Sequence, residues 1–155
     1  MTIHLINENK MTDIHPKGIL IPIGGGEDRE ESKDVLCRLI SETGKTNPGI
    51  CLVTLATDVP DKVAETYRKA FGDLQISSVS VIHYDGRKDA DTDENLEKIR
   101  KCDMVLFSGG KQLKLGTLLG GTALLSLIRG RYYDEPLFVV AGTSAGAAAM
   151  SNTMI

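Results

Sequence analysis

Cysteine is scarce in the sequence, which contains Cys37, Cys51 and Cys102 and no others. These three have neither the CxxC spacing of redox sites nor the ligand spacing of a zinc site, and an odd number argues against a complete disulfide framework. We therefore expect buried, reduced thiols. The sequence predicts no metal site and no cofactor.

Basic clusters and long hydrophobic runs are also absent. The formal net charge is −3, and no basic cluster is longer than Arg129-Gly130-Arg131 or Arg100-Lys101. Residues 1–4 do not begin a signal peptide, and every apolar run falls far short of the roughly 20 residues that span a bilayer. These absences argue against nucleic-acid binding and against a membrane protein. We expect a cytoplasmic protein that binds neither nucleic acid nor a membrane.

What the sequence does contain fits one globular domain of 155 residues, 41% of them hydrophobic and 25% charged. Apolar runs of strand length alternate with segments of helical spacing. Strands are expected at residues 18–23, 50–56, 76–84, 104–107 and 137–140, with a frayed or edge strand at 3–6. Helices are expected from about Val35 to a C-cap at Gly44, from Pro60 to Gly72, from Asp93 to Lys101, and as two short helices within 111–129, the second over 122–129.

The predicted strands are continuous apolar runs, which is typical of a parallel sheet covered by helices on both faces. We therefore predict an α/β fold with a mostly parallel sheet. In such sheets, ligands bind beyond the carboxyl ends of the strands. Polar and glycine residues follow the predicted strands at 24–28, 57–58, 84–87, 108–112 and 144. One edge of the sheet should gather them all.

A possible nucleophile lies in the last of these positions. Residues 142–146, Gly-Thr-Ser-Ala-Gly, match the pattern GxSxG between an apolar run and an alanine-rich segment. A strand, tight turn and helix would expose Ser144 at a sharp bend, where the N–H groups of a helix N-terminus favour negative charge. In the alternative interpretation, Ser144 is an ordinary N-cap and the glycines only permit close packing.

The triple glycine at residues 24–26 follows the first predicted strand. It fits neither the GxGxxG dinucleotide motif nor the phosphate loop with its lysine, and Glu27 and Asp28 would repel a phosphate. Two interpretations are equally good: a loop that lets the backbone approach the rim of a site, and a plain tight turn.

Three pieces in this order, IGGGED (23–28), LFSGGKQLKL (106–115) and AGTSAGAAAM (141–150), resemble the cyanophycinase and aspartyl-dipeptidase family of serine peptidases. The resemblance covers nearly all of the chain from about residue 18. It implies a flavodoxin-like α/β sheet related to that of the class I glutamine amidotransferases, with serine as the nucleophile. Cyanophycinases in this family hydrolyse cyanophycin, an arginine-bearing aspartate polymer, to β-Asp-Arg dipeptides.

The resemblance also implies roles for individual residues. Ser144 is similar to the nucleophile, and the N–H groups of Gly110 and Ala145 are similar to the oxyanion hole. Gln112 resembles a residue of the cyanophycinase substrate pocket. The neighbouring glycines Gly25, Gly26 and Gly109 are expected to line that pocket. The sequence departs from the family at Lys111, where aspartate or asparagine is usual, and we expect this side chain to point to solvent.

A catalytic base is harder to find. A serine nucleophile needs a base and an orienting acid, which in folds with this elbow follow the serine, yet the eleven residues after Ser144 include no His, Asp or Glu. Of the histidines, His4 and His15 lie near the start, and His83 is expected to be a strand-end residue bonded to backbone. We therefore expect residues 1–155 to be the N-terminal part of one peptidase domain, with the histidine and acid on a missing C-terminal segment or partner chain.

Three functions stay open at this stage. The first is a serine hydrolase that cleaves aspartyl linkages such as those of cyanophycin through an acyl-enzyme on Ser144. The second is an α-aspartyl dipeptidase, and the third is a non-catalytic half-domain that acts in assembly or ligand binding. In each enzyme, the complete unit is expected to form a homo-oligomer.

Overall fold

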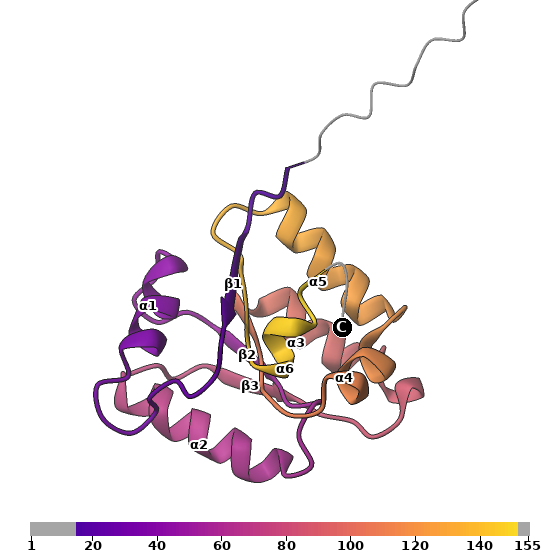
Figure 1. The fold of residues 1–155 in the computed structure, drawn as a ribbon. Coiled ribbons are helices and arrows are strands. Elements are labelled where there is room, and N and C mark those ends of the chain that lie inside the picture. Colours follow the sequence, from indigo (N-terminus) through magenta and orange to yellow (C-terminus); the bar gives the residue numbers. More distant parts are fainter. Residues whose placement is uncertain (1–14, 152–155) are drawn as a thin grey trace, which may run out of the picture.

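The computed structural model describes residues 15–151, which form a five-stranded sheet with helices on both faces (Figure 1). All strand pairings are parallel, in the spatial order β1-β5-β4-β2-β3. The strands are β1 (Ile19–Ile23), β2 (Ile50–Val53), β3 (Val79–Ile82), β4 (Met104–Phe107) and β5 (Val139–Thr143). The helices are α1 (Asp34–Glu42), α2 (Pro60–Asp73), α3 (Asp93–Lys101), α4 (Gln112–Leu119), α5 (Ala123–Asp134) and α6 (Ala145–Ala148), with a short 3-10 helix η1 (Arg87–Asp89). The predicted α/β fold with a parallel sheet is confirmed.

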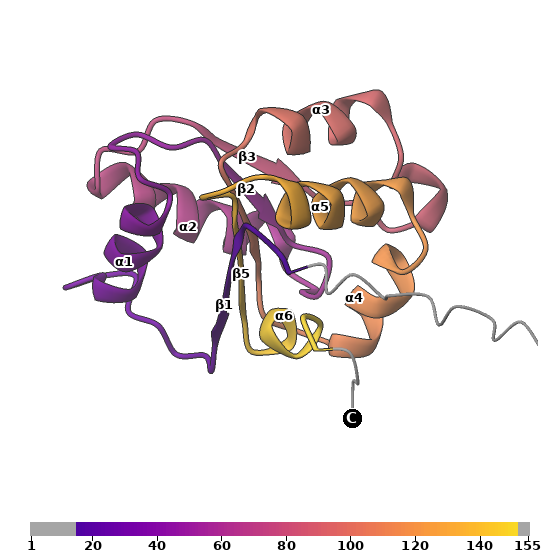
Figure 2. The ribbon, with the colours of Figure 1, turned by 90° about the horizontal axis from the view of Figure 1, so that it is seen from above.

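The sheet separates two helical layers. Figure 2 shows α1 and α2 on one side of the sheet and α3, α4, α5 and α6 on the other. Successive side chains of a strand point to opposite faces. In β4, Met104 and Leu106 accordingly pack in the α1–α2 layer, whereas Val105 and Phe107 pack in the other layer. The inner strands are continuous apolar runs because both of their faces are buried.

The strand order places the last strand between the first and the fourth. The series β3-β2-β4-β5 follows the flavodoxin-like order, and β1 lies outermost, beside β5. The loops that leave β1 and β4 therefore flank the end of β5 on both sides. Ser144, the residue after β5, stands between them.

Three strands differ from the sequence prediction by more than one residue. The strand expected at residues 50–56 ends at Val53. Leu137 was expected to begin the last strand, but it is 54% exposed and has a left-handed φ of 65°, so β5 begins two residues later and continues to Thr143. The strand expected at residues 76–84 is shorter because β3 is an edge strand that pairs only with β2. The expected strand at residues 3–6 lies outside the described range.

The cysteines are only partly as expected. Cys51 and Cys102 are buried, but Cys37 is exposed, so the prediction of three buried thiols is wrong. Cys37 lies on α1, whose buried residues are Leu36 and Leu39. Because each helical residue turns by about 100°, the residue next to a buried leucine can face solvent.

A carboxylate organises the loop between β1 and α1. The backbone N–H groups of Glu30, Glu31 and Lys33 donate to the Asp28 carboxylate at 2.9, 3.0 and 3.1 Å, and the Ser32 hydroxyl donates at 3.2 Å. These backbone hydrogen bonds, the one from Glu31 first, hold the pKa of Asp28 well below its usual value. The ionised Asp28 side chain thus holds together the loop that leads from the triple glycine into α1.

The short helix α6 packs directly on the backbone of the sheet. A Cβ atom on Gly142 would lie 2.6 Å from the carbonyl oxygen of Gly146, and a Cβ atom on Gly146 would collide with the carbonyl oxygen of Phe107. Glycine at both positions is therefore a requirement of the close approach of α6 to β5 and β4.

We predict opposite effects for two glycine-to-alanine substitutions. Gly146→Ala should destabilise the protein by about 1–3 kcal/mol, because the new methyl group meets backbone atoms that cannot move aside. Gly130→Ala, within α5, should stabilise it by about 0.4–1 kcal/mol, because nothing lies within 4 Å of the added Cβ atom. Urea unfolding of both variants checks this, and equal effects would contradict the packing described for α6.

We also predict that the effect of Asp28→Ala depends on pH. Because the folded pKa of Asp28 is depressed, its ionised form contributes stability above the unfolded pKa of about 3.9, and this contribution is lost as the pH falls. The variant should melt at a lower temperature than the parent protein at pH 7, and the gap should narrow at pH 3. Calorimetry at both values measures it; a gap that stays constant would mean that the carboxylate does not hold the loop.

Candidate active site

Ser144 occupies a strained corner between β5 and α6. Its φ is 52° and its ψ is −112°, a combination that a residue with a side chain rarely adopts, and the residue is exposed. The Ser144 amide donates to the carbonyl oxygen of Ile23 at 2.9 Å, and the Ser144 carbonyl accepts from the amide of Ala148 at 3.0 Å. The corner is thus fixed by β1 on one side and by α6 on the other, and the predicted strand, bend and helix are present.

Glycine loops flank the serine on both sides. A Cβ atom on Gly25 would lie 3.6 Å from the Ser144 Cβ atom, and one on Gly109 would lie 3.4 Å from it. Gly25 and Gly26 have φ values of 116° and 68°, which explains glycine in the first loop. Of the two interpretations of the triple glycine, close backbone approach at the rim of a site is the one that this geometry fits.

Gly110 and Ala145 each follow a residue of this corner, since Gly109 lies beside Ser144 and Ala145 comes directly after it. Among the hydrogen bonds of residues 15–151, none uses the N–H group of either residue. The loop that carries Gly110 is held against the segment after β2, because the amide of Lys111 donates to the carbonyl oxygen of Ala56 at 2.7 Å. Gly110 has a φ of 143°, and a side chain there would collide with that same carbonyl group. Neither amide therefore has an acceptor within the described part of the chain.

A carboxylate beside the serine was missed in the sequence, where Glu27 was considered as a charge that would repel a phosphate. The hydroxyl of Thr143 donates to one oxygen of Glu27 at 2.8 Å, and the hydroxyl of Tyr67 donates to the other in a short hydrogen bond. Burial, together with the Glu27 carboxylate, raises the pKa of Tyr67. No local sequence signal could pair Glu27 with residues 40 and 116 positions away.

These groups line a hollow of about 250 Å³. Arg29 and Tyr67 both line this hollow, and the guanidinium carbon of Arg29 lies 5.1 Å from the centre of the Tyr67 ring. The lining residues are Gly25, Gly26, Glu27, Arg29, Val63, Tyr67, Ser108, Gly109, Thr143 and Ser144. Of the residues expected to line a substrate pocket, the three glycines are present, whereas Gln112 is the half-buried first residue of α4 and is not among these ten.

Lys111 is exposed, as the sequence predicted, with 69% of its side chain accessible, and it also forms an ion pair at the surface. Its ammonium group lies 2.5 Å from the Asp58 carboxylate, and that of Lys114 lies 3.5 Å from the same carboxylate. The hydrogen bond from Lys111 is the main reason why the pKa of Asp58 is lowered. The positive charge that departs from the family pattern is thus paired at the surface.

The histidines of the described range lie away from Ser144. In His83, Nδ1 lies 3.1 Å from the carbonyl oxygen of Thr54, and Nε2 lies 3.5 Å from the Asp85 carboxylate, so it is the backbone-bonded strand-end residue that was expected. It follows β3, three strands from β5, which corresponds to about 14 Å at the usual strand spacing. His15 is exposed and precedes the opposite end of β1, and His4 lies outside the described range.

Residues 15–151 contain no group of three or more His, Cys, Asp or Glu side chains placed to hold a metal ion. Within the same range, every helix is too short or too polar to reach across a lipid bilayer.

Comparison with known proteins identifies the family. Peptidase family S51 matches residues 19–155. The chain is 32% identical over 139 residues to a cyanophycinase from Synechococcus elongatus, covering 90% of this chain and 43% of that protein. It is 31% identical over 136 residues to a cyanophycinase from Geminocystis herdmanii, covering 88% and 50%. The chain therefore spans about half the length of these relatives.

A solved structure agrees with the fold. The crystal structure of a peptidase from an acI-B1 Actinobacterium superposes with a TM-score of 0.73 at 23% identity, covering 88% of this chain and 58% of that one. By its match over residues 19–155, the chain belongs to peptidase family S51.

Proposed function

We propose that the protein acts as a serine-type hydrolase on aspartyl peptide linkages, with Ser144 as nucleophile. One observation carries the proposal: Ser144 is exposed at a strained strand-to-helix corner, flanked by glycine loops. Strain at a non-glycine residue persists only where the surrounding structure enforces it, and it is concentrated at functional sites. Because the chain belongs to a peptidase family, the strained serine is the residue that we assign to attack on the peptide bond.

The chemistry follows from the corner. The Ser144 oxygen attacks the substrate carbonyl carbon as a base takes the hydroxyl proton, and negative charge develops on the carbonyl oxygen. The free amides of Gly110 and Ala145 are the donors that we assign to this oxyanion. The base returns the proton to the leaving amine, and water then hydrolyses the acyl-enzyme. Gly25, Gly26, Gly109 and Gln112 are the residues that we assign to the substrate pocket.

The base and its orienting acid remain to be assigned, because neither described histidine lies beside Ser144. We infer that residues 1–155 correspond to the N-terminal part of a larger peptidase domain. The histidine and the acid then belong to the polypeptide that the longer relatives carry outside the matched region, here called the complementary segment. It acts either as a continuation of the chain or as a separate subunit.

The substrate assignment rests on the relatives. Those matched at 32% and 31% identity are cyanophycinases, which supports a β-linked aspartyl-arginine polymer as substrate. An α-aspartyl dipeptidase is the alternative within the same chemistry, and it would prefer a free N-terminal aspartate in a normal peptide linkage. The absence of a described histidine near Ser144 favours a third possibility, a non-catalytic half-domain, for the chain by itself.

We predict that Ser144→Ala abolishes hydrolysis. In a fusion of the chain to the complementary segment of the Synechococcus elongatus cyanophycinase, the variant should lose about 10⁴-fold or more in kcat on cyanophycin, because nothing else supplies the attacking oxygen. A serine-reactive phosphonate should label Ser144 in the parent fusion and not in the variant, as read by mass spectrometry. His83→Ala is the control and should keep its rate within about twofold, since His83 lies about 14 Å away. If the parent fusion neither hydrolyses cyanophycin nor is labelled at Ser144, the hydrolase proposal is wrong and the non-catalytic interpretation is favoured.

We further predict that Glu27→Gln loosens the corner. An amide presents N–H groups to one of the two hydroxyls that now donate to Glu27, so at least one hydrogen bond is lost or reversed. The variant should lose about 1–3 kcal/mol of stability, as expected for a hydrogen bond to a charged group. Glu65→Gln, at an exposed position of α2, is the matched control and should stay within about 0.5 kcal/mol of the parent protein. Similar losses in both variants would show that Glu27 has no special role.

A further inference from the structure

The edge strand β1 is entirely apolar although its side chains are only partly covered by the described part of the protein. Its sequence, ILIPI, contains no polar residue, yet none of its five residues is buried. The neighbouring strand β5 is buried at all five positions, and β4 at all four. A continuous apolar run is typical of a strand that is covered on both faces, so β1 has the sequence of an inner strand and the environment of an outer one.

Within residues 15–151, the backbone groups on the outer edge of β1 also have no hydrogen-bond partner. Ile19 and Ile23 bond toward β5, because the Ile19 amide donates to Phe138 and the Ile23 carbonyl accepts from Ser144. Backbone groups alternate in direction along a strand, so those of Leu20 and Pro22 point away from β5. Pro22 has no N–H group, but the amide and carbonyl groups of Leu20 and the carbonyl group of Pro22 are available to another strand.

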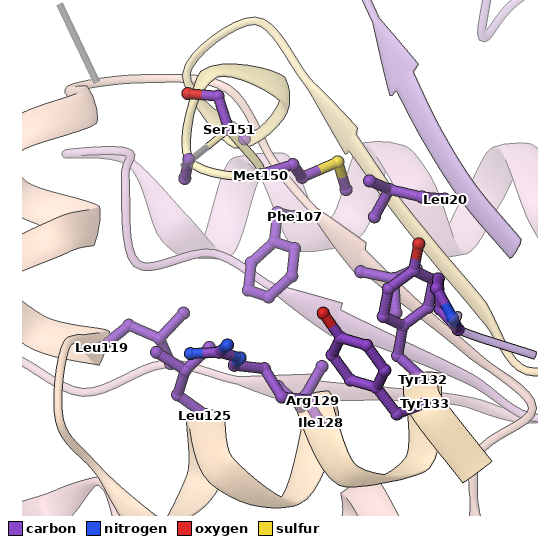
Figure 3. Close-up of a pocket in the computed structure, with 14 residues that line it drawn as sticks. Leu20, Phe107, Leu119, Leu125, Ile128, Arg129, Tyr132, Tyr133, Met150 and Ser151 are labelled. Atoms are coloured by element: carbon purple, nitrogen blue, oxygen red, sulfur yellow. The ribbon is translucent and has the colours of Figure 1, made fainter. Parts of the chain in front are cut away.

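An apolar groove adjoins this edge. Figure 3 shows it between α5 and α6, with Leu20 of β1 at one end, Phe107 at its floor, and the rings of Tyr132 and Tyr133 rising from α5. The groove has a volume of about 520 Å³. It is lined by Pro16, Leu20, Phe107, Leu119, Leu125, Ile128, Arg129, Tyr132, Tyr133, Val140, Gly146, Ala149, Met150 and Ser151. We call it the α5–α6 groove.

We propose that the outer edge of β1 and the α5–α6 groove together bind the complementary segment, with one of its strands paired to β1 and an apolar side chain in the groove. The proposal rests on the proposed function only for the existence of that segment. The relatives have about as much polypeptide outside the matched region as within it, which is enough to extend the sheet and cover the groove.

The edge and the groove together favour a polypeptide over a small molecule. A small apolar ligand could fill 520 Å³, but it would leave the Leu20 backbone groups and the exposed face of β1 uncovered. Arg129, an exposed residue on the groove wall, has no ion pair within the described part of the chain. The bound segment should therefore carry an acidic side chain near Arg129 beside its apolar anchor.

Thiol labelling tests the position of the segment. Leu20→Cys reports the edge of β1, where the native side chain is 40% exposed, and Leu113→Cys on α4 is the matched control, where the native side chain is 82% exposed. Both are made in a Cys37→Ser background, because Cys37 is the exposed native thiol of the described range. Labelling by N-ethylmaleimide is compared between the 155-residue chain alone and its fusion to the Synechococcus elongatus complementary segment.

In the fusion, labelling of Leu20→Cys should slow by about tenfold or more, while labelling of Leu113→Cys should stay within about twofold. Equal labelling of Leu20→Cys in a folded fusion would overturn the proposal, because the segment would then lie elsewhere. Protection in the chain alone that rises with protein concentration would overturn it in favour of a second copy. Because the readout is thiol access, a protected fusion without hydrolysis refutes the proposed function and leaves this inference intact.

Discussion

The close contact between α6 and the sheet is the constraint on which the site depends. Glycine at positions 142 and 146 allows the helix to approach the backbone of β5 and β4 within distances that exclude a methyl group. The chain must therefore turn sharply at Ser144, and its φ of 52° is the result. The exposed hydroxyl, the adjacent free amide of Ala145 and the contact with the glycine loops all follow from this one approach.

The surrounding elements hold that corner from three directions. The Ile23 carbonyl fixes the Ser144 amide from β1, and Glu27 joins the loop after β1 to Tyr67 on α2 and to Thr143 on β5. The loop with Gly110 is tied to the segment after β2 through Ala56. These contacts connect segments that are distant in sequence, so changes in α2 or in the first loop would alter the position of Ser144.

The sequence predicted the fold well where the pattern was local. Continuous apolar runs identified all five described strands, and the GxSxG pattern placed Ser144 at the corner. Three features could not be derived in this way. The pairing of Glu27 with Tyr67 and Thr143 depends on long-range contacts, the exposure of Cys37 depends on the rotation of α1, and the pairing of Lys111 with Asp58 depends on how two loops meet. Each is a consequence of tertiary packing.

The position of β1 also affects synthesis. Ile19 pairs with Val139, a separation of 139 − 19 = 120 residues, so β1 leaves the ribosome long before the strand that it pairs with. At about 5–20 residues per second, this delay lasts roughly 6–24 s. During that time a five-residue apolar strand is open to unwanted association. Pro22 lies inside that strand, where a missing amide hydrogen interrupts strand-to-strand contact between nascent chains.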